Sequence, residues 1–182
     1  MLSGSMSDTG VSHRRGESQT ALHQGAKTAP ELVRPSFAKA AWWLLAYCCA
    51  AILFGAFVRA SYSGDGCGTS CPMCGGSLIP TFTGAPRAVE FTHRVTTGLL
   101  MLANIALAVA ARRAFPRGDA ARKAANLALI TVLISAVIGA LLVTFQWVTD
   151  DKSAGRALTM PIHLVNNFIA IAALAATAYY AG

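Results

Sequence analysis

Two histidines lie at the openings of long apolar runs, where ionisable side chains are costly. His93 belongs to the stretch "EFTHR", which precedes "VTTGLLMLANIALAVAA", and His163 follows "TMP" ahead of another apolar run. Two imidazoles could bind a heme iron from both faces, because histidine is a common axial ligand. They could also contribute to another transition-metal site, or form hydrogen bonds with lipid headgroups. His13 and His23 lie in a polar tail, where solvated side chains are expected.

A carboxylate and a guanidinium flank His93. Glu90 precedes it by three residues, which places both side chains on nearly one face of a helix. The carboxylate could orient the imidazole, accept a proton or act on a bound substrate, or it could simply favour the helix dipole. Arg94 could pair with a heme propionate, or extend its side chain to the membrane interface.

Three cysteines stand in one glycine-rich segment, "SYSGDGCGTSCPMCGGSLIP". Cys67, Cys71 and Cys74 allow three single disulfide pairings, with one thiol left over. Cys71 and Cys74 have the C-x-x-C spacing of thiol redox centres, which is also half a set of zinc ligands. A disulfide-stapled loop that caps the bundle is the structural alternative. Cys48 and Cys49 lie in the middle of an apolar run and are expected to pack as small apolar residues.

Several smaller polar and glycine residues bear on helix packing. Thr97, Asn166 and Asn167 each lie about one turn beyond a histidine, and we expect them to form hydrogen bonds between helices. Ser135 and Gly139 form a small-xxx-small pair, which indicates either a close helix contact or the ordinary composition of a membrane helix.

The elements that must position these side chains are four apolar runs. They cover about residues 41–58, 91–111, 124–148 and 160–181, each close to the ~20 residues that cross a bilayer. A helix satisfies its own backbone in lipid, so the sequence predicts an all-α integral membrane protein. With 54% hydrophobic and 13% charged residues the chain is unlike a soluble domain. Residues 1–38 are expected to be a disordered cytosolic tail, and residues 39–182 the four-span bundle.

The basic residues set the expected orientation. The net charge of +7 gathers in the tail and in "RRAFPRGDAARK" between the second and third runs, a pattern of membrane topology rather than nucleic-acid binding. Both termini are therefore expected in the cytoplasm, and the cysteine-rich loop, residues 60–88, outside a bacterial inner membrane. Short connections favour an up-down-up-down bundle, in which the second and fourth spans are diagonal partners. His93 and His163 would then face each other at one depth, within about 5 Å of the outer helix ends.

Taken in order, these motifs resemble the heme A synthase family. The segment "FVRASYSGDGCGTSCPMCGGSLIP" is similar to the family's first extracytoplasmic loop, "EFTHR" to its Glu-x-x-His-Arg motif, and "HLVNNF" to the histidine motif of its fourth span. The resemblance runs from about Phe54 to the C-terminus. The family fold has two four-helix halves, of which the first hosts the substrate heme and the second a heme b. This chain resembles the first half.

The resemblance implies roles for individual residues. His93 and His163 would be the axial ligands of the heme, and Glu90 would act near the oxidised methyl group. Cys67 and Cys74 would form the loop disulfide. The implied reaction is oxidation of the C8 methyl of heme O to the formyl of heme A, for assembly of a terminal oxidase.

The implied partners are membrane lipid, heme O, heme O synthase and a terminal oxidase, together with a homodimer mate or a second four-helix half. Cys71 departs from the family pattern, where a large apolar residue is expected. Two other functions remain open. One is a four-span, quinone-linked thiol-disulfide oxidoreductase, which would use the C-x-x-C. The other is a non-catalytic b-type cytochrome or heme carrier, which would use both histidines without Glu90.

Overall fold

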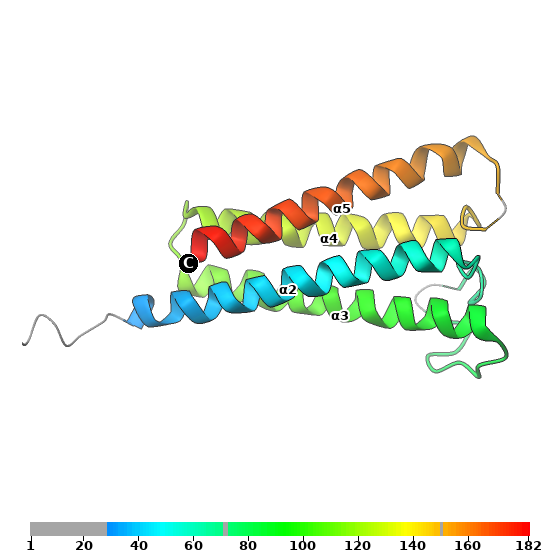
Figure 1. Cartoon of the computed structure of the whole chain (residues 1–182), viewed down its shortest axis with the longest axis horizontal. Helices are drawn as coiled ribbons and strands as arrows, with labels where there is room; N and C mark the ends of the chain where they lie inside the picture. Colours follow the sequence, from blue (N-terminus) through cyan, green and yellow to red (C-terminus); the bar gives the residue numbers. More distant parts are fainter. Residues whose placement is uncertain (1–28, 71–72, 150) are drawn as a thin grey trace, which may run out of the picture. The chain divides into compact units, whose positions relative to one another are not determined.

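The computed structural model describes residues 29–70, 73–149 and 151–182, and its regular structure is helical. The helices are α2 (Ala29–Ala60), α3 (Ala85–Ala114), α4 (Ala120–Thr144) and α5 (Ala154–Ala181), shown in Figure 1. Within the described ranges there is no β-strand, only an isolated bridge between Cys74 and Ser77. The predicted all-α class is confirmed. Residues Arg34 to Gly182 form one compact unit, to which the following description applies.

All four helices are long and apolar enough to cross a membrane, and the chain is an integral membrane protein. The apolar segments are Arg34–Ala60, Ala85–Ala114, Ala120–Thr144 and Ala154–Ala181. Exposed aromatic side chains mark the two ends of the bundle, as in the interfacial belts of membrane proteins. The belt at the end that holds the C-terminus contains Trp42, Trp43, Tyr179 and Tyr180, and the opposite belt contains Tyr62, Phe82 and Phe145. From Trp43 to Ala60, α2 rises about 26 Å, close to the thickness of the hydrocarbon.

The helices begin and end at other residues than hydropathy suggests. α2 begins at Ala29, nine residues ahead of the expected end of the tail at residue 38; residues 1–28, with His13 and His23, lie outside the described residues. α3 and α5 each begin six residues before the expected 91 and 160, while α4 ends at Thr144 instead of 148. Apolar content locates only the part of a helix that meets lipid. The polar first turns of α3 and α5 are set by Pro86 at the start and by the Ser153 cap, whose hydroxyl accepts from the Arg156 amide.

These earlier starts change the depth of the two histidines relative to the helix ends. His93 is the ninth residue of α3 and His163 the tenth of α5. At 1.5 Å per residue, they lie about 12 and 13 Å from the helix ends, so the expected distance of about 5 Å is wrong. Their distances from the helix ends remain matched, because both helices gain six residues.

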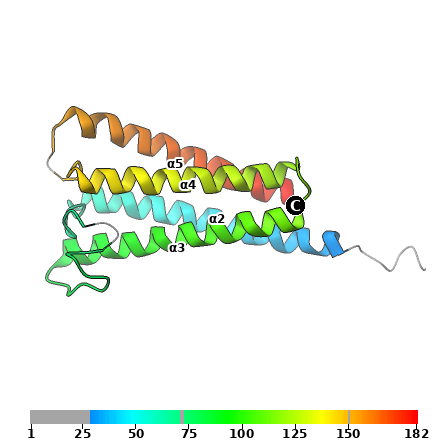
Figure 2. The ribbon, with the colours of Figure 1, turned by 180° about the vertical axis from the view of Figure 1, so that it is seen from behind.

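Contacts between neighbouring helices give their order around the bundle. The Tyr47 hydroxyl of α2 donates to the Thr96 carbonyl of α3 at 3.0 Å. α3 packs on α4, and α4 packs on α5. At the C-terminus, a Cβ at Gly182 would lie 3.8 Å from the Ala38 Cβ, which brings the end of α5 to α2. The order α2, α3, α4, α5 makes α3 and α5 diagonal partners, as predicted, and Figure 2 shows the same neighbours from behind.

The apolar core occupies the half of the bundle near the C-terminus, which we call the inner half. The buried cluster draws on residues 37–51, 100–115, 121–128 and 173–181. Cys48 packs in this cluster as expected, and Cys49 is half-buried. Toward the other end, which we call the outer half, buried apolar side chains are fewer. Figure 1 shows α3 and α5 spreading apart in this direction. The outer half is where both histidines lie.

Candidate functional site

Each of the two histidines has a buried ring nitrogen for which the described residues provide no hydrogen-bond partner. Nδ1 of His93 and Nδ1 of His163 are both buried and lack a hydrogen-bond partner among the described residues. His93 lies on α3 and His163 on α5, the two diagonal helices. Because a buried polar atom without a partner is costly, such an atom calls for an explanation. Diagonal helices therefore carry two imidazoles whose buried Nδ1 atoms have no hydrogen-bond partner among the described residues.

α2 closes one side of the His93 ring. Phe54 meets the ring edge-on, with the ring centroids 5.7 Å apart. Gly55 lies beside the other edge: a Cβ built at Gly55 would stand 3.1 Å from Cε1 and 3.4 Å from Nε2 of His93. The missing side chain is what lets α2 approach this closely. The sequence places Gly55 in an apolar run but gives no indication of its neighbour, so this contact could not be predicted.

The donor set fits a heme better than a bare metal ion. Within residues 34–70, 73–149 and 151–182, no group of three or more histidine, cysteine, aspartate or glutamate side chains could hold a metal ion. Protein sites for single transition metals use at least three such ligands. A porphyrin brings four nitrogens of its own, so only two axial ligands are needed from the protein. His93 and His163 are two candidate ligands of this kind, one on each of two diagonal helices.

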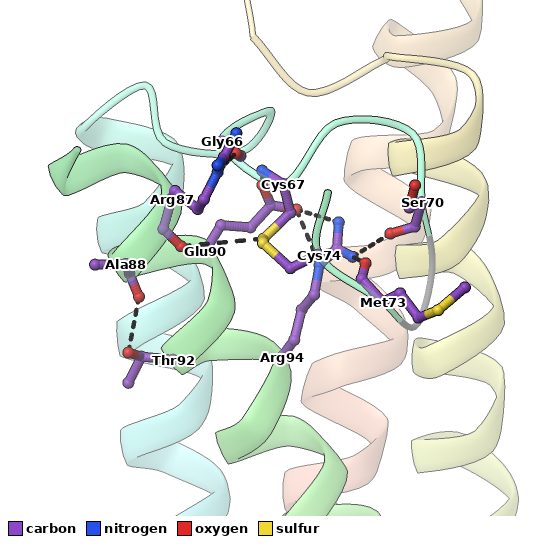
Figure 3. The surroundings of a disulfide bond; sticks show 10 residues. All are labelled: Gly66, Cys67, Ser70, Met73, Cys74, Arg87, Ala88, Glu90, Thr92 and Arg94. Carbon is purple, nitrogen blue, oxygen red and sulfur yellow. Dashed lines mark hydrogen bonds and ion pairs between the residues drawn. A yellow bond between two sulfur atoms is a disulfide. The ribbon is translucent and has the colours of Figure 1, made fainter. Parts of the chain in front are cut away.

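Glu90 is engaged by the loop above the histidines rather than by His93. Its side chain is buried, with the residue only 3% exposed. Oε2 accepts a hydrogen bond from the Cys67 amide at 2.6 Å, and Oε1 accepts one from Nε of Arg94 at 3.0 Å. Figure 3 shows the carboxylate between the loop and the arginine. The carboxylate therefore ties the cysteine-rich loop to α3.

Arg94 and Arg87 extend this attachment along the loop. Nη1 of Arg94 donates to the Met73 carbonyl at 2.6 Å and also to the Ser70 carbonyl. Nε of Arg87 donates to the Gly66 carbonyl at 3.1 Å. We call the group Arg87, Glu90 and Arg94 the loop clamp. The predictions that Glu90 is catalytic and that Arg94 pairs with a propionate stay predictions. The sequence carried no indication that these side chains would bind backbone groups of the loop.

A disulfide closes the segment that the clamp holds. The structure joins Cys67 to Cys74, with the two Cα atoms 4.4 Å apart and both residues buried. The Gly75 amide donates to the Cys67 carbonyl at 3.0 Å, and the Cys74 amide to the Ser77 carbonyl at 2.9 Å. Cys71, the alternative partner, lies outside the described residues. Disulfide and clamp together make one compact cap at the outer end of α3 (Figure 3).

Hydrogen bonds fix α5 on α4 one turn inward of His163. Nδ2 of Asn166 donates to the Thr131 carbonyl at 2.8 Å and to Oγ of Ser135 at 2.7 Å. Oγ of Ser135 in turn donates to Oδ1 of Asn167 at 2.7 Å. The expected interhelical bonds of Asn166 and Asn167 are thus confirmed.

Two smaller packing predictions have other outcomes. The Thr97 hydroxyl bonds to the His93 and Arg94 carbonyls of its own helix, so its predicted interhelical bond is wrong. A Cβ at Gly139 would meet nothing within 4 Å, which excludes a close helix contact at that glycine.

Comparison with known proteins agrees with this arrangement. A family model described as cytochrome oxidase assembly protein, COX15-CtaA, matches residues 38–182. A Thermus thermophilus protein named protoheme IX farnesyltransferase is 45% identical over 141 residues, covering 78% of this chain and 23% of that protein. Heme A synthases of Exiguobacterium sp. and Exiguobacterium sibiricum are 40% and 36% identical, covering 63% and 68% of this chain and 37% and 39% of theirs. No solved structure matches.

The fold and the site define a four-span membrane bundle with a diagonal pair of interior histidines beneath a disulfide-closed cap. The chain belongs to the heme A synthase family, the COX15-CtaA family of cytochrome oxidase assembly proteins. It spans between about a quarter and two fifths of the length of the curated relatives named above.

Proposed function

We propose that the chain binds heme between α3 and α5 through His93 and His163. The observation that carries the proposal is the pair of buried Nδ1 atoms without partners, on diagonal helices, in the half of the bundle where apolar packing is sparse. A heme placed there would meet two axial ligands and a largely apolar surround. When bound, it would supply the iron and the methyl group to be oxidised. Heme b is the other form of the cofactor that the same two ligands would accept.

The proposed reaction is oxidation of the C8 methyl of heme O to the formyl of heme A, in which water would supply the formyl oxygen and an external acceptor would take the four electrons. Family membership supports a role in heme A biosynthesis and oxidase assembly. Glu90 is the proposed catalytic residue, because it lies on the His93 face of α3 one turn further out. Both of its oxygens accept hydrogen bonds from the cap. Acting on a bound group would require one of these bonds to lengthen, so the cap would control access to the carboxylate.

The proposed setting is a bacterial plasma membrane, with both termini in the cytoplasm and the cap outside. Heme O would come from a heme O synthase, and heme A would pass to a terminal oxidase. The similarity to a Thermus protein named protoheme IX farnesyltransferase supports a link to the enzyme that attaches the farnesyl group. A second four-helix half, or a second copy of this chain, would complete the two-half arrangement of the family.

The thiol-disulfide oxidoreductase alternative loses its main support. It required Cys71 and Cys74 to act as a C-x-x-C redox pair, whereas Cys74 is joined to Cys67. A disulfide whose Cys67 amide is bound by a buried carboxylate is better explained as part of a cap.

The test of heme binding is purification of the full chain from heme-replete membranes, followed by absorption spectroscopy and mass analysis of the extracted heme. The expected result is a low-spin bis-histidine spectrum that is lost in His93→Ala and in His163→Ala. The matched controls His13→Ala and His23→Ala alter tail histidines and should keep the spectrum. A colourless wild-type protein would contradict the proposal.

The test of catalysis compares Glu90→Ala with Glu90→Gln. The glutamine keeps an acceptor for the Cys67 amide but removes the charge. A catalytic Glu90 predicts that both variants keep the bis-histidine spectrum and accumulate heme O instead of heme A. If Glu90→Gln still yields heme A, Glu90 acts only by holding the cap. If the wild-type chain carries heme b and forms no heme A, it is a non-catalytic cytochrome.

A further inference from the structure

The loop between α2 and α3 has two sides of opposite character. The disulfide side is buried and tied to α3 by the loop clamp. The other side carries Leu78, Ile79 and Phe82, whose exposed fractions are 77%, 84% and 59%. Clustered apolar side chains with such high exposed fractions indicate an interaction surface. We call residues 78–82 the apolar segment.

The apolar segment lies beside a membrane-spanning helix, at the depth where the hydrocarbon ends. The Phe82 ring meets the Phe91 ring edge-to-face, with centroids 5.8 Å apart. Phe91 is the seventh residue of α3, and from it to Arg112 near the inner end the helix rises about 32 Å, close to one hydrocarbon thickness. Figures 1 and 2 both show part of this loop folded back along the first turns of α3. The apolar segment therefore lies near the boundary between headgroups and acyl chains.

The charge pattern indicates that lipid, and not another protein, contacts the apolar segment. From Gly75 to Pro86 there is no charged residue, although most of this stretch lies in the loop that connects two membrane-spanning helices. Arg87 and Asp65, the nearest charges on either side, stand outside this stretch. Three side chains also give far less area than the roughly 800 Å² that each partner contributes to a stable protein interface. Tyr62 and Phe145 are exposed at the same end of the bundle, so the apolar segment continues an existing aromatic belt.

We propose that residues 78–82 insert into the outer interface of the bilayer and anchor the cap from its lipid side. The cap is then held at two places: by the loop clamp on the side facing the bundle, and by the acyl boundary on the side facing away from it. Lipid thus becomes part of what positions the disulfide and Glu90 above His93. The proposal concerns the loop alone and stands whether or not the chain binds heme.

Spin-label accessibility in phosphatidylcholine vesicles tests the proposal. The full chain would carry Cys48→Ala, Cys49→Ala and Cys71→Ser, with the Cys67–Cys74 disulfide intact, and a nitroxide at Ile79→Cys. The matched control is Thr69→Cys, an exposed polar position in the same loop. For the label at 79, oxygen, which concentrates in lipid, should relax the nitroxide several-fold more than a water-soluble nickel chelate. The label at 69 should show the reverse.

Two outcomes overturn the proposal. A label at 79 that responds to the nickel chelate as the label at 69 does would place the segment in water. A label shielded from both reagents would place it under protein. Because a new cysteine can exchange with the disulfide, Ile79→Trp provides an independent measurement. Its added emission should be quenched by brominated phosphatidylcholine and spared by aqueous acrylamide, and the opposite result would also overturn the proposal.

Discussion

The inner and outer halves of the bundle are built on different principles. In the inner half many of the fully buried side chains are small, among them Ala41, Ala111, Ala121 and Ala128, beside the larger Leu174, Asn104 and Thr177. Small residues let helix backbones approach each other closely. In lipid there is no hydrophobic driving force between helices, so this close packing is a main source of stability. In the outer half the buried groups include Glu90, Asn166 and two ring nitrogens that have no partner among the described residues, whereas the inner half has one such atom, Oδ1 of Asn104. The inner half is held mainly by close packing, and the outer half mainly by specific hydrogen bonds around His93 and His163.

Because of this difference, we expect stability to depend mainly on the inner half and heme binding mainly on the outer half. A close-packed inner half fixes the helix axes, and so fixes the directions in which α3 and α5 present their histidines. The outer half can then leave ring nitrogens without partners because the polar ties of the cap and of the α4–α5 contact hold their surroundings. Substitutions in the inner half should therefore alter global stability, those in the outer half should alter local order, and those that touch His93 or His163 should alter heme binding.

The largest loss of stability is expected from Glu90→Ala in the cap. It leaves the Arg94 guanidinium, which is mostly buried, without its carboxylate, and the Cys67 amide without an acceptor. Removing one partner of a buried ion pair costs about 3–5 kcal/mol. The loss should appear as faster hydrogen exchange across residues 66–77, with the inner half unchanged. Arg94→Ala should weaken the same residues, and a double variant should cost less than the sum of the two. Unchanged loop exchange in Glu90→Ala would show that the disulfide alone orders the cap.

The inner half should be most sensitive to added volume. Ala111 is completely buried between helices, while Ala110, its neighbour on α3, is exposed. Ala111→Leu should lower the free energy of unfolding by about 1–3 kcal/mol, because extra methylenes force backbones apart. Unfolding by denaturing detergent, followed by circular dichroism, gives the measurement. Ala110→Leu is the matched control and should change little. Equal effects at the two positions would mean that the inner half is not close-packed.

Two glycines test whether the outer half is shaped around His93. At Gly55 a methyl group would meet the His93 ring at 3.1 Å, whereas at Gly139 it would meet nothing within 4 Å. Alanine is favoured over glycine inside a helix by about 1 kcal/mol. Gly139→Ala should therefore raise stability by up to that amount and leave the heme spectrum unchanged. Gly55→Ala should gain less and should weaken heme retention, measured by heme transfer to apomyoglobin. If the two variants behave alike, the ring does not depend on Gly55.

The sequence predicted those features that depend on chain order and composition. Four apolar lengths give four helices, and alternation of direction makes α3 and α5 diagonal partners, so His93 and His163 could be paired before any coordinates. The helix starts could not be predicted as well, because polar residues such as Arg87 and Glu90 extend α3 beyond the apolar run. The clamp could not be predicted at all. Its partners are backbone groups of Gly66, Cys67 and Met73, whose positions depend on the path of the loop and not on residue type.

The smallest change in the free energy of unfolding is expected from a substitution where the two halves meet. Ser135 accepts from Asn166 and donates to Asn167, so it joins α4 to α5 one turn inward of His163. Interhelical hydrogen bonds in membranes contribute about 0.6 kcal/mol on average. Ser135→Ala should therefore lower the unfolding free energy by about that amount, while Asn166 keeps its bond to the Thr131 carbonyl. If this bond network also sets the rotation of α5, the heme spectrum should shift without loss of heme, since His163 lies on the same helix. Gly139→Ala, one turn along α4, is the control that should leave the spectrum in place. A shift in neither variant would assign the orientation of α5 to the close-packed inner half alone.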